Sequence, residues 1–414
     1  MTASVPGDRR NDGAEPLSTL LVAAALALGS AVSLGLARFS YALLLPPMRA
    51  DLGWSYFVAG AMNTVNAAGY LAGALAAPSA LRRFGARAVF LAGIAVTALA
   101  LFGHGLVVAD ATLYALRFVT GVGSAATFVS GGLLAARLIA HPTAAPHADS
   151  AAATSAGLVL GIYYGGTGVG IVASALLVPT LAERAVAHAW QGAWMGLAAL
   201  AGVAVMIAAA ATRRLASAAP AAADRDLRAR FRWRAFAPAL AAYLLFGLGY
   251  IGYMTFVISL LREERLAGAV VVAFFVMLGA AVVASSWLWA RLLQRSRGGG
   301  ALALLNALVA VATLLPVLSV RPLAVFASGL LFGAVFLSLV ASTTSLVRHN
   351  LAPAAWPAGI AAFTIVFAAG QIVGPSAVGV IADHFGGLRA GFACSGAVLA
   401  LAAIVATRQK AIAG

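Results

Sequence analysis

Two arginines lie inside otherwise apolar stretches of this 414-residue sequence. Arg38 falls within 18–46 and Arg117 within 111–139, and neither stretch contains an acidic residue. A charged side chain near the centre of a bilayer costs roughly 2.5–3.5 kcal/mol on insertion scales, and such side chains usually face an interior cavity. Because a guanidinium fork matches the geometry of carboxylates and phosphates, the two arginines predict a site for an organic anion.

The two arginines are also expected at similar depth. Arg38 lies eight residues before Pro46 and Arg117 six residues after Ala111, which places both about 9–12 Å below the outer edge of the membrane at 1.5 Å per residue. The alternative for Arg38 is hydrogen bonding to backbone carbonyls or snorkelling to the interface. The sequence alone leaves both alternatives open.

Four polar side chains in apolar stretches complete the predicted substrate-binding set: Tyr41, Asn66, Tyr250 and Gln371. Tyrosines near the ends of membrane helices are more often interface anchors. Amide side chains in such helices more often form hydrogen bonds between helices. Substrate contact by these four residues is therefore one of two interpretations.

The elements that must position these residues are membrane helices. Hydrophobic residues make up 63% of the chain and charged residues 9%, with a mean hydropathy of +0.98, which excludes a soluble enzyme, a disordered chain and a disulfide scaffold. Apolar runs of about 20 residues span a bilayer as helices. The sequence predicts an all-α integral membrane protein with twelve such helices, at 18–46, 55–78, 87–108, 111–139, 151–179, 192–212, 236–261, 268–290, 299–319, 322–347, 354–381 and 389–407.

Basic residues fix the expected orientation. With the N-terminus inside, the inner segments carry 19 Lys and Arg residues and the outer segments six, and basic residues are enriched on the cytoplasmic side. Both termini are therefore expected in the cytoplasm, and the net charge of +15 is explained without nucleic acid. The predicted parts are an N-terminal tail (1–17), two six-helix halves (18–212 and 236–407), a basic linker (213–235) and a C-terminal tail (408–414).

The two halves resemble each other in sequence. The segment 35–41 matches 247–253 at an offset of 212, which puts Tyr250 at the position of Arg38. Three glycines of the fifth helix match three of the eleventh at an offset of 209: Gly161, Gly165 and Gly170 against Gly370, Gly374 and Gly379. These matches predict a duplicated six-helix unit.

Several motifs resemble those of the major facilitator superfamily (MFS). Arg117 followed by Gly121-Val122-Gly123 is similar to the superfamily's fourth-helix motif, and 157–170 is similar to its glycine-rich fifth helix. The segments 35–46, 249–256 and 370–383 resemble the YbfB/YjiJ-type subfamily.

This resemblance implies two pseudo-symmetric halves that rock around a midplane site. It also implies that helices one and four line a central cavity, where Arg38 and Arg117 would share one half of the site. The fourth-helix arginine recurs in members with different substrates, so a structural role for Arg117 is the alternative.

One loop departs from the superfamily pattern. After the second helix, an arginine (Arg82) stands where the superfamily has an acidic residue. The better match to that pattern is 379–386, which is expected on the outer side and is interpreted as an echo of the repeat rather than a cytoplasmic gate.

The predicted function is secondary active transport of a small organic solute, most simply an anion, by alternating access. The only lysine is Lys410, so no phosphate-binding loop of the Walker type exists, and no catalytic constellation, metal site or cofactor is predicted. Efflux of amphipathic or drug-like compounds is the alternative, followed by a non-transporting membrane protein. A monomer in a bacterial plasma (inner) membrane is expected, with lipid and a small-molecule substrate as partners and a proton as a candidate co-substrate.

Overall fold

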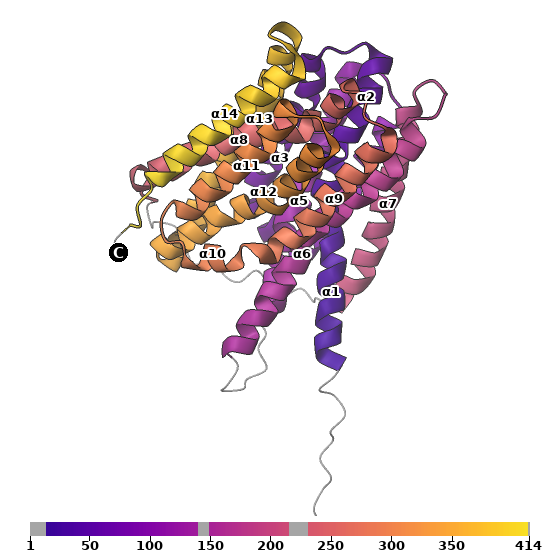
Figure 1. The fold of residues 1–414 in the computed structure, drawn as a ribbon. Helices are drawn as coiled ribbons and strands as arrows, with labels where there is room; N and C mark the ends of the chain where they lie inside the picture. Colours follow the sequence, from indigo (N-terminus) through magenta and orange to yellow (C-terminus); the bar gives the residue numbers. More distant parts are fainter. Residues whose placement is uncertain (1–13, 140–148, 215–230, 413–414) are drawn as a thin grey trace, which may run out of the picture.

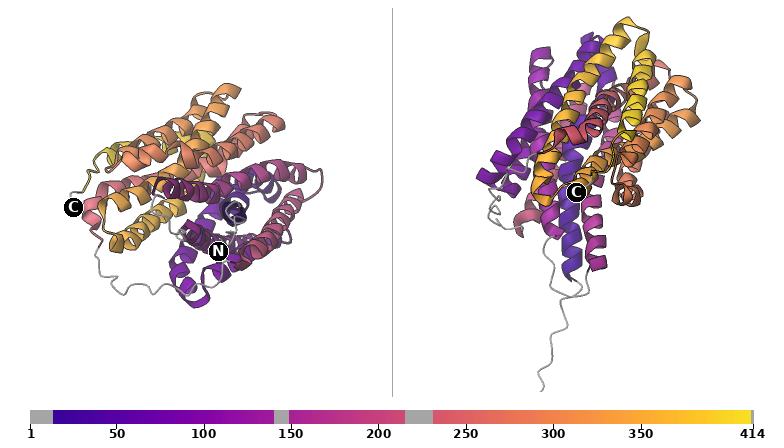
Figure 2. Two further views of the ribbon diagram at one scale, coloured as in Figure 1. Left: turned by 90° about the horizontal axis from the view of Figure 1, so that it is seen from below. Right: turned by 90° about the vertical axis from the view of Figure 1, so that its left-hand side faces the viewer.

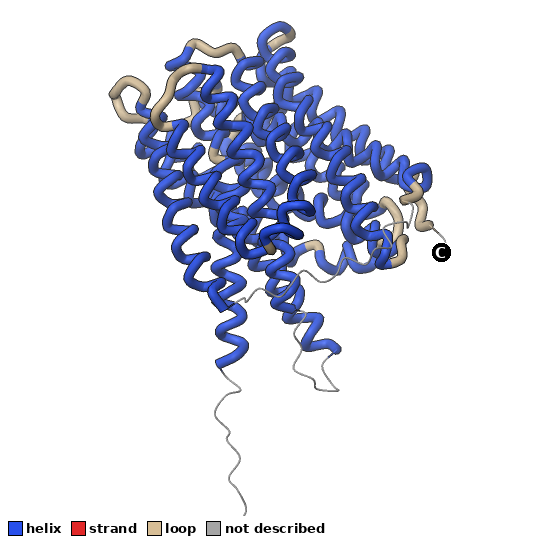
Figure 3. The backbone as a smooth tube through the Cα atoms, turned by 180° about the vertical axis from the view of Figure 1, so that it is seen from behind, coloured by secondary structure: helices blue, strands red, loops and turns tan. Residues whose placement is uncertain are grey.

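The computed structural model describes residues 14–139, 149–214 and 231–412. Within these ranges the chain is helical and contains no strand (Figure 3). Most of the predicted N-terminal tail and basic linker, and the last two residues of the C-terminal tail, lie outside the described residues.

The first membrane helix is continuous but changes its hydrogen-bonding pattern, from α1 (Ala14–Ser30) through the π-helix η1 (Ala31–Phe39) to α2 (Tyr41–Leu52). The other helices of the first half are α3 (Tyr56–Phe84), α4 (Ala86–His104), α5 (Asp110–Ile139), α6 (Asp149–Ala182) and α7 (Ala189–Ala211). The second half contains α8 (Ala237–Glu263), α9 (Gly268–Leu288), α10 (Ala290–Arg295), α11 (Gly300–Leu318), α12 (Pro322–Asn350), α13 (Trp356–His384) and α14 (Gly387–Thr407). Short 3₁₀ turns are η2 (Thr212–Arg214), η3 (Trp233–Phe236) and η4 (Pro353–Ala355).

The prediction of twelve membrane helices is confirmed. Eleven helices of the described chain are long and apolar enough to cross a membrane, and α3, which carries Arg82 and Arg83 in its last turn, is the twelfth long helix. The largest differences are at the ends of two helices: the second was predicted to end at Pro78 but ends at Phe84, and the first was predicted to end at Pro46 but ends at Leu52. Membrane helices tolerate proline where neighbours satisfy the freed carbonyls, and this helix ends instead at Gly53, whose φ of 68° suits a left-handed cap.

The two halves lie side by side, with the first half drawn in indigo to magenta and the second in rose to yellow (Figures 1 and 2). We call the end of the bundle where α1 begins and α14 ends the terminal face, and the other end, which carries α2, the opposite face. Between the halves, α3 packs along α13 and α6 along α9, while α2 contacts α8.

Glycines permit the closest approaches between the halves. A Cβ atom at Gly60 of α3 would lie 2.4 Å from the carbonyl oxygen of Pro375 on α13, and one at Gly168 of α6 would lie 2.3 Å from that of Gly279 on α9. Both distances are too short for any side chain. The two helix pairs therefore form backbone-to-backbone seams that hold one half against the other.

Candidate functional site

A stretch of π-helix carries Arg38. In η1 the ladder widens to i→i+5 bonds, of which the 3.0 Å bond from the Ser40 amide to the Gly35 carbonyl is the last. A Cβ atom at Gly35 would lie 2.5 Å from Cα of Gly170, so η1 and α6 are in backbone contact here. π-Helical turns are rare and are frequent at functional sites.

The Arg38 side chain points to the interface between the halves and is 3% exposed. Its Nη2 donates a 3.0 Å hydrogen bond to Oε1 of Gln371 on α13, and Nε2 of Gln371 donates to the hydroxyl of Tyr250 on α8. The guanidinium carbon lies 5.6 Å from the ring centre of Tyr70. Three of the six predicted site residues thus form one chain of hydrogen bonds that crosses from the first half to the second.

Arg38 has no anionic partner among the described residues. None of the ion pairs in the described ranges includes it, and its Nε is buried without a hydrogen-bond partner. An uncompensated guanidinium in a low-dielectric interior attracts an anion strongly. The arrangement can therefore bind a carboxylate or phosphate group at Arg38.

Aromatic rings form an apolar wall beside this chain. The Tyr250 ring stacks on Phe246 at 4.6 Å and on Phe367 at 5.6 Å between ring centres, and it lies 6.1 Å from Phe336. Phe39, the neighbour of Arg38 in η1, meets Phe336 edge-on at 5.6 Å. A cation and a wall of stacked rings therefore adjoin at the interface between the halves.

Arg117 has a different environment, although it was predicted to share the cavity with Arg38. Its Nη1 donates to the carbonyl of Ala37 at 2.8 Å, its Nη2 to Oδ1 of Asn63 at 3.2 Å, and its Nε to the carbonyl of Met62 at 3.5 Å. The side chain is 1% exposed. All three guanidinium nitrogens are thus engaged by protein atoms, which tie η1 and α3 to α5.

Tyr41 and Asn66 belong to this second group. The guanidinium carbon of Arg117 lies 4.9 Å from the ring centre of Tyr41, whose hydroxyl donates to the carbonyl of Ala59 at 2.8 Å. Asn66 donates to the backbone carbonyl of Arg117 itself at 3.0 Å. The structure thus divides the six predicted residues into a group of three around Arg38 and a group of three around Arg117. Substrate contact by the second group stays a prediction.

Polar contacts between the halves gather near the opposite face, and they were not predicted from the sequence. Asp383 at the end of α13 accepts hydrogen bonds from the backbone amides of Tyr56 at 2.9 Å and Phe57 at 2.8 Å, at the start of α3. The hydroxyl of Tyr56 donates to Glu263 of α8, and Arg262 forms an ion pair with Glu183, which directly follows α6.

Deeper in the bundle, the halves are joined by uncharged side chains. Asn63 donates to the Thr255 hydroxyl at 2.7 Å, and the hydroxyl oxygens of Thr64 and Ser376 lie 2.9 Å apart. The sequence signal for Asp383 was its place as the acidic residue of the 379–386 motif. That motif was interpreted from the sequence as an echo of the repeat and not as a contact.

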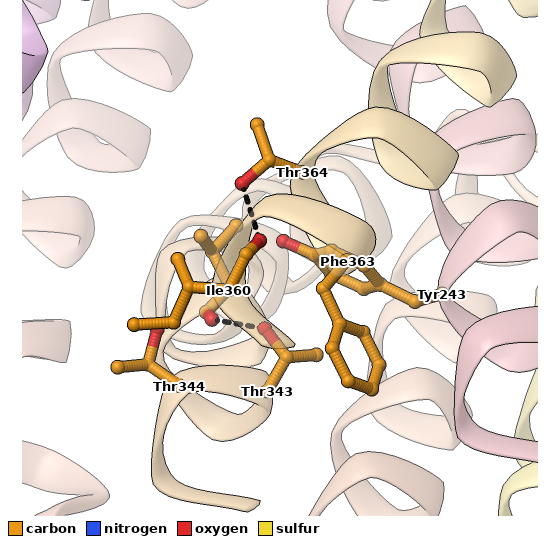
Figure 4. A pocket seen from close by; sticks show the side chains of 7 residues that line it. Tyr243, Thr343, Thr344, Ile360, Phe363 and Thr364 are labelled. Carbon is orange, nitrogen blue, oxygen red and sulfur yellow. Dashed lines mark hydrogen bonds between the residues drawn. The ribbon is translucent and has the colours of Figure 1, made fainter. Parts of the chain in front are cut away.

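One cavity lies at the interface between the halves, and a smaller one lies within the second half. The first, of about 370 Å³, lies at the opposite face between the halves and is lined by Leu43, Pro46, Pro47, Pro179, Ala182, Glu183, Ile258 and Arg262. The smaller one, of about 50 Å³, lies between α8, α12 and α13, beside Tyr243, Thr343 and Thr364 (Figure 4). At this volume the pocket has room for water rather than for an organic solute, and the Thr343 and Thr364 hydroxyls bond to carbonyls of their own helices. The described residues contain no group of three His, Cys, Asp or Glu side chains able to hold a metal ion.

Comparison with solved structures defines the class of the fold. Two crystal structures of the nucleoside transporter NupG, the first of them of a point mutant, superpose with TM-scores of 0.70 and 0.67, each at 14% sequence identity. The alignments cover 93% and 96% of this chain and 98% and 99% of those chains. At this identity the likeness shows the fold, which is that of an MFS transporter.

The family follows from the sequence. A family model described as "Uncharacterised MFS-type transporter YbfB" matches residues 30–407, and the chain belongs to this family. A search of curated proteins gives no match. Family and fold together identify a multi-span membrane protein that acts as a secondary transporter of a small molecule.

Proposed function

We propose that this protein transports a small organic anion by alternating access and binds the anion through Arg38. The observation that carries the proposal is a buried guanidinium at the interface between the halves, with an unpartnered Nε and no carboxylate partner among the described residues. Intramembrane charges that persist without a partner generally mark substrate or ion pathways.

The distribution of contacts between the halves supports alternating access. The bonds of Asp383 and Glu263 to α3 and the pair Arg262–Glu183 join the two halves near the opposite face. Exposed arginines such as Arg82 and Arg348 are on the terminal face, where the positive-inside rule assigns the cytoplasm. On this basis we infer a conformation closed toward the outside, with both termini in the cytoplasm of a bacterial inner membrane.

The test is thermal stabilisation of the detergent-purified protein by matched probes: benzoate, phenyl phosphate, benzamide, a nucleoside and tetraphenylphosphonium. A ligand that binds only the native state raises its stability by RT ln(1 + [L]/Kd). We expect an anion to stabilise the wild type and to lose that effect in Arg38→Gln. The matched control is Arg82→Gln, which removes an exposed arginine whose one hydrogen bond among the described residues is to Ser79 of its own helix.

Stabilisation by tetraphenylphosphonium or neutral probes alone, unchanged in Arg38→Gln, would contradict the proposal and favour efflux of amphipathic compounds. The nucleoside is included because the solved structures with the same fold are of a nucleoside transporter. Coupling to a proton is tested separately in liposomes, where anion uptake should rise when an inward pH gradient is imposed if the substrate carries its own proton.

A further inference from the structure

We propose that the substrate carries a single carboxylate and that this carboxylate takes the place of Gln371 on Arg38. The inference rests on the proposed function and adds the substrate's charge and the step by which its binding reaches the second half. Four observations carry it: the unused donor of Arg38, the neutral acceptor beside it, the engagement of Arg117, and the place of Gln371 between the halves.

Only one of the two donors along one edge of the Arg38 guanidinium has a partner. In a guanidinium, the Nε hydrogen and one Nη2 hydrogen project from the same edge and together match the two oxygens of a carboxylate. Here Nη2 bonds to the amide oxygen of Gln371 at 3.0 Å while Nε is buried and unpartnered. An amide has one acceptor oxygen and cannot satisfy both donors as a carboxylate does. Gln371 is therefore a weaker partner on an edge shaped for a bidentate anion.

The number of free cations limits the charge of the substrate. Arg38 and Arg117 are the only basic residues deep within the described membrane helices, and Arg117 already donates from all three of its nitrogens. A second anionic group in the site would have no cation to compensate it, and burial of an unpaired charge is costly. The site therefore favours a monoanion, with its organic body against the rings of Phe336 and Phe367.

Exchange at Arg38 has a structural consequence. The bond between Arg38 and Gln371 joins η1 to α13, so a carboxylate that replaces it removes one link between the halves. Gln371 keeps its bond to Tyr250 and stays with the second half. Binding thus removes one of the contacts that hold the halves together.

Gln371→Met tests the exchange, because it removes the competing acceptor and retains the length of the side chain. We expect this variant to bind benzoate about tenfold more tightly than the wild type, by titration of thermal stability, since the anion no longer displaces a bond to a charged group. The control Gln191→Met removes a glutamine that bonds to Val107 within the first half, and should leave the affinity unchanged. Phthalate, which is a dianion, should bind more weakly than benzoate to the wild type and to Gln371→Met.

A second measurement follows the link between the halves. Cysteines at Thr64 and Ser376, whose hydroxyl oxygens are 2.9 Å apart, should form a disulfide across the interface in a Cys394→Ala background. Benzoate should slow this reaction when Gln371 is present and have much less effect in Gln371→Met, where the link is already absent.

The outcomes separate the two proposals. If benzoate affinity falls or stays the same in Gln371→Met, while Arg38→Gln still abolishes binding, the exchange is overturned and the anion site survives. If phthalate binds as tightly as benzoate, the single-charge argument is overturned. If no anion stabilises the wild type or Gln371→Met, the anion site itself fails and the exchange fails with it.

Discussion

The contact between Asp383 and the start of α3 offers the sharpest test of how the halves are held together. Asp383→Asn removes the negative charge and one of the two oxygens that accept the amides of Tyr56 and Phe57. A hydrogen bond to a charged group contributes about 1.5–3 kcal/mol, and a carboxylate at a helix N-terminus typically 0.3–1 kcal/mol. Because Asp383 is exposed and therefore screened by solvent, we expect a loss of about 1 kcal/mol, or roughly a fivefold shift toward opening of the opposite face.

The assay is the rate at which a buried cysteine at position 59 reacts with a maleimide. Ala59 is completely buried and lies one turn after Tyr56 on α3, so its replacement by cysteine, with Cys394→Ala, reports on opening. When closing is faster than labelling, the rate follows the open population, and Asp383→Asn should raise it about fivefold. Asp51→Asn is the control, because Asp51 bonds to His188 and Trp190 within the first half.

Two outcomes would refute this reasoning. Equal rates in wild type and Asp383→Asn would show that the contact contributes nothing to closure. An equal increase in Asp51→Asn would show that loss of any acidic residue near the opposite face loosens the bundle.

Three further predictions concern the bundle itself. Arg117→Gln should lower the midpoint of thermal unfolding in detergent, by a loss of about 2–4 kcal/mol, because it leaves buried carbonyls without their donors; an unchanged midpoint would free Arg117 for a role in binding. Gly60→Val should abolish transport in liposomes at normal expression, because its side chain would overlap the carbonyl of Pro375 in the seam; normal transport would mean that the seam does not form during the cycle. Glu183→Gln should raise the maleimide rate less than Asp383→Asn does, because the pair with Arg262 is partly exposed and such pairs contribute about 0–1 kcal/mol; a change larger than that measured for Asp383→Asn would reverse the ranking of the two contacts.

The fold was predictable because its main determinant is visible in the sequence. Apolar runs of membrane-spanning length define the helices, and the glycine pattern shared by spans five and eleven indicates the duplication. The internal repeat aligned Tyr250 with Arg38, and the structure joins these two residues through Gln371. The helix ends were less predictable, as at Pro46, because proline tolerance depends on neighbouring helices.

The resemblance to the superfamily offered a structural role for Arg117, but the partners that distinguish the two arginines were not predictable. Arg38 and Arg117 have the same side chain at similar expected depth, but Arg117 is satisfied chiefly by backbone carbonyls of Ala37 and Met62. Every residue has a carbonyl, so no sequence pattern indicates which one is in reach. The role of Asp383 was hidden for a related reason, since its partners are backbone amides on a helix more than 300 positions away.

The helix α13 connects the proposed binding event to closure of the opposite face. Gln371, which bonds to Arg38, and Asp383, which bonds to the start of α3, are twelve residues apart on this helix, or about 18 Å along its axis. Both bonds join α13 to the first half. A substrate that displaces the bond between Gln371 and Arg38 therefore leaves α13 held to the first half by fewer contacts, among them the bond of Asp383. Gln371→Met and Asp383→Asn combined should therefore raise the maleimide rate at position 59 by more than the product of their separate effects, whereas a rate equal to that product would show that the two contacts act independently.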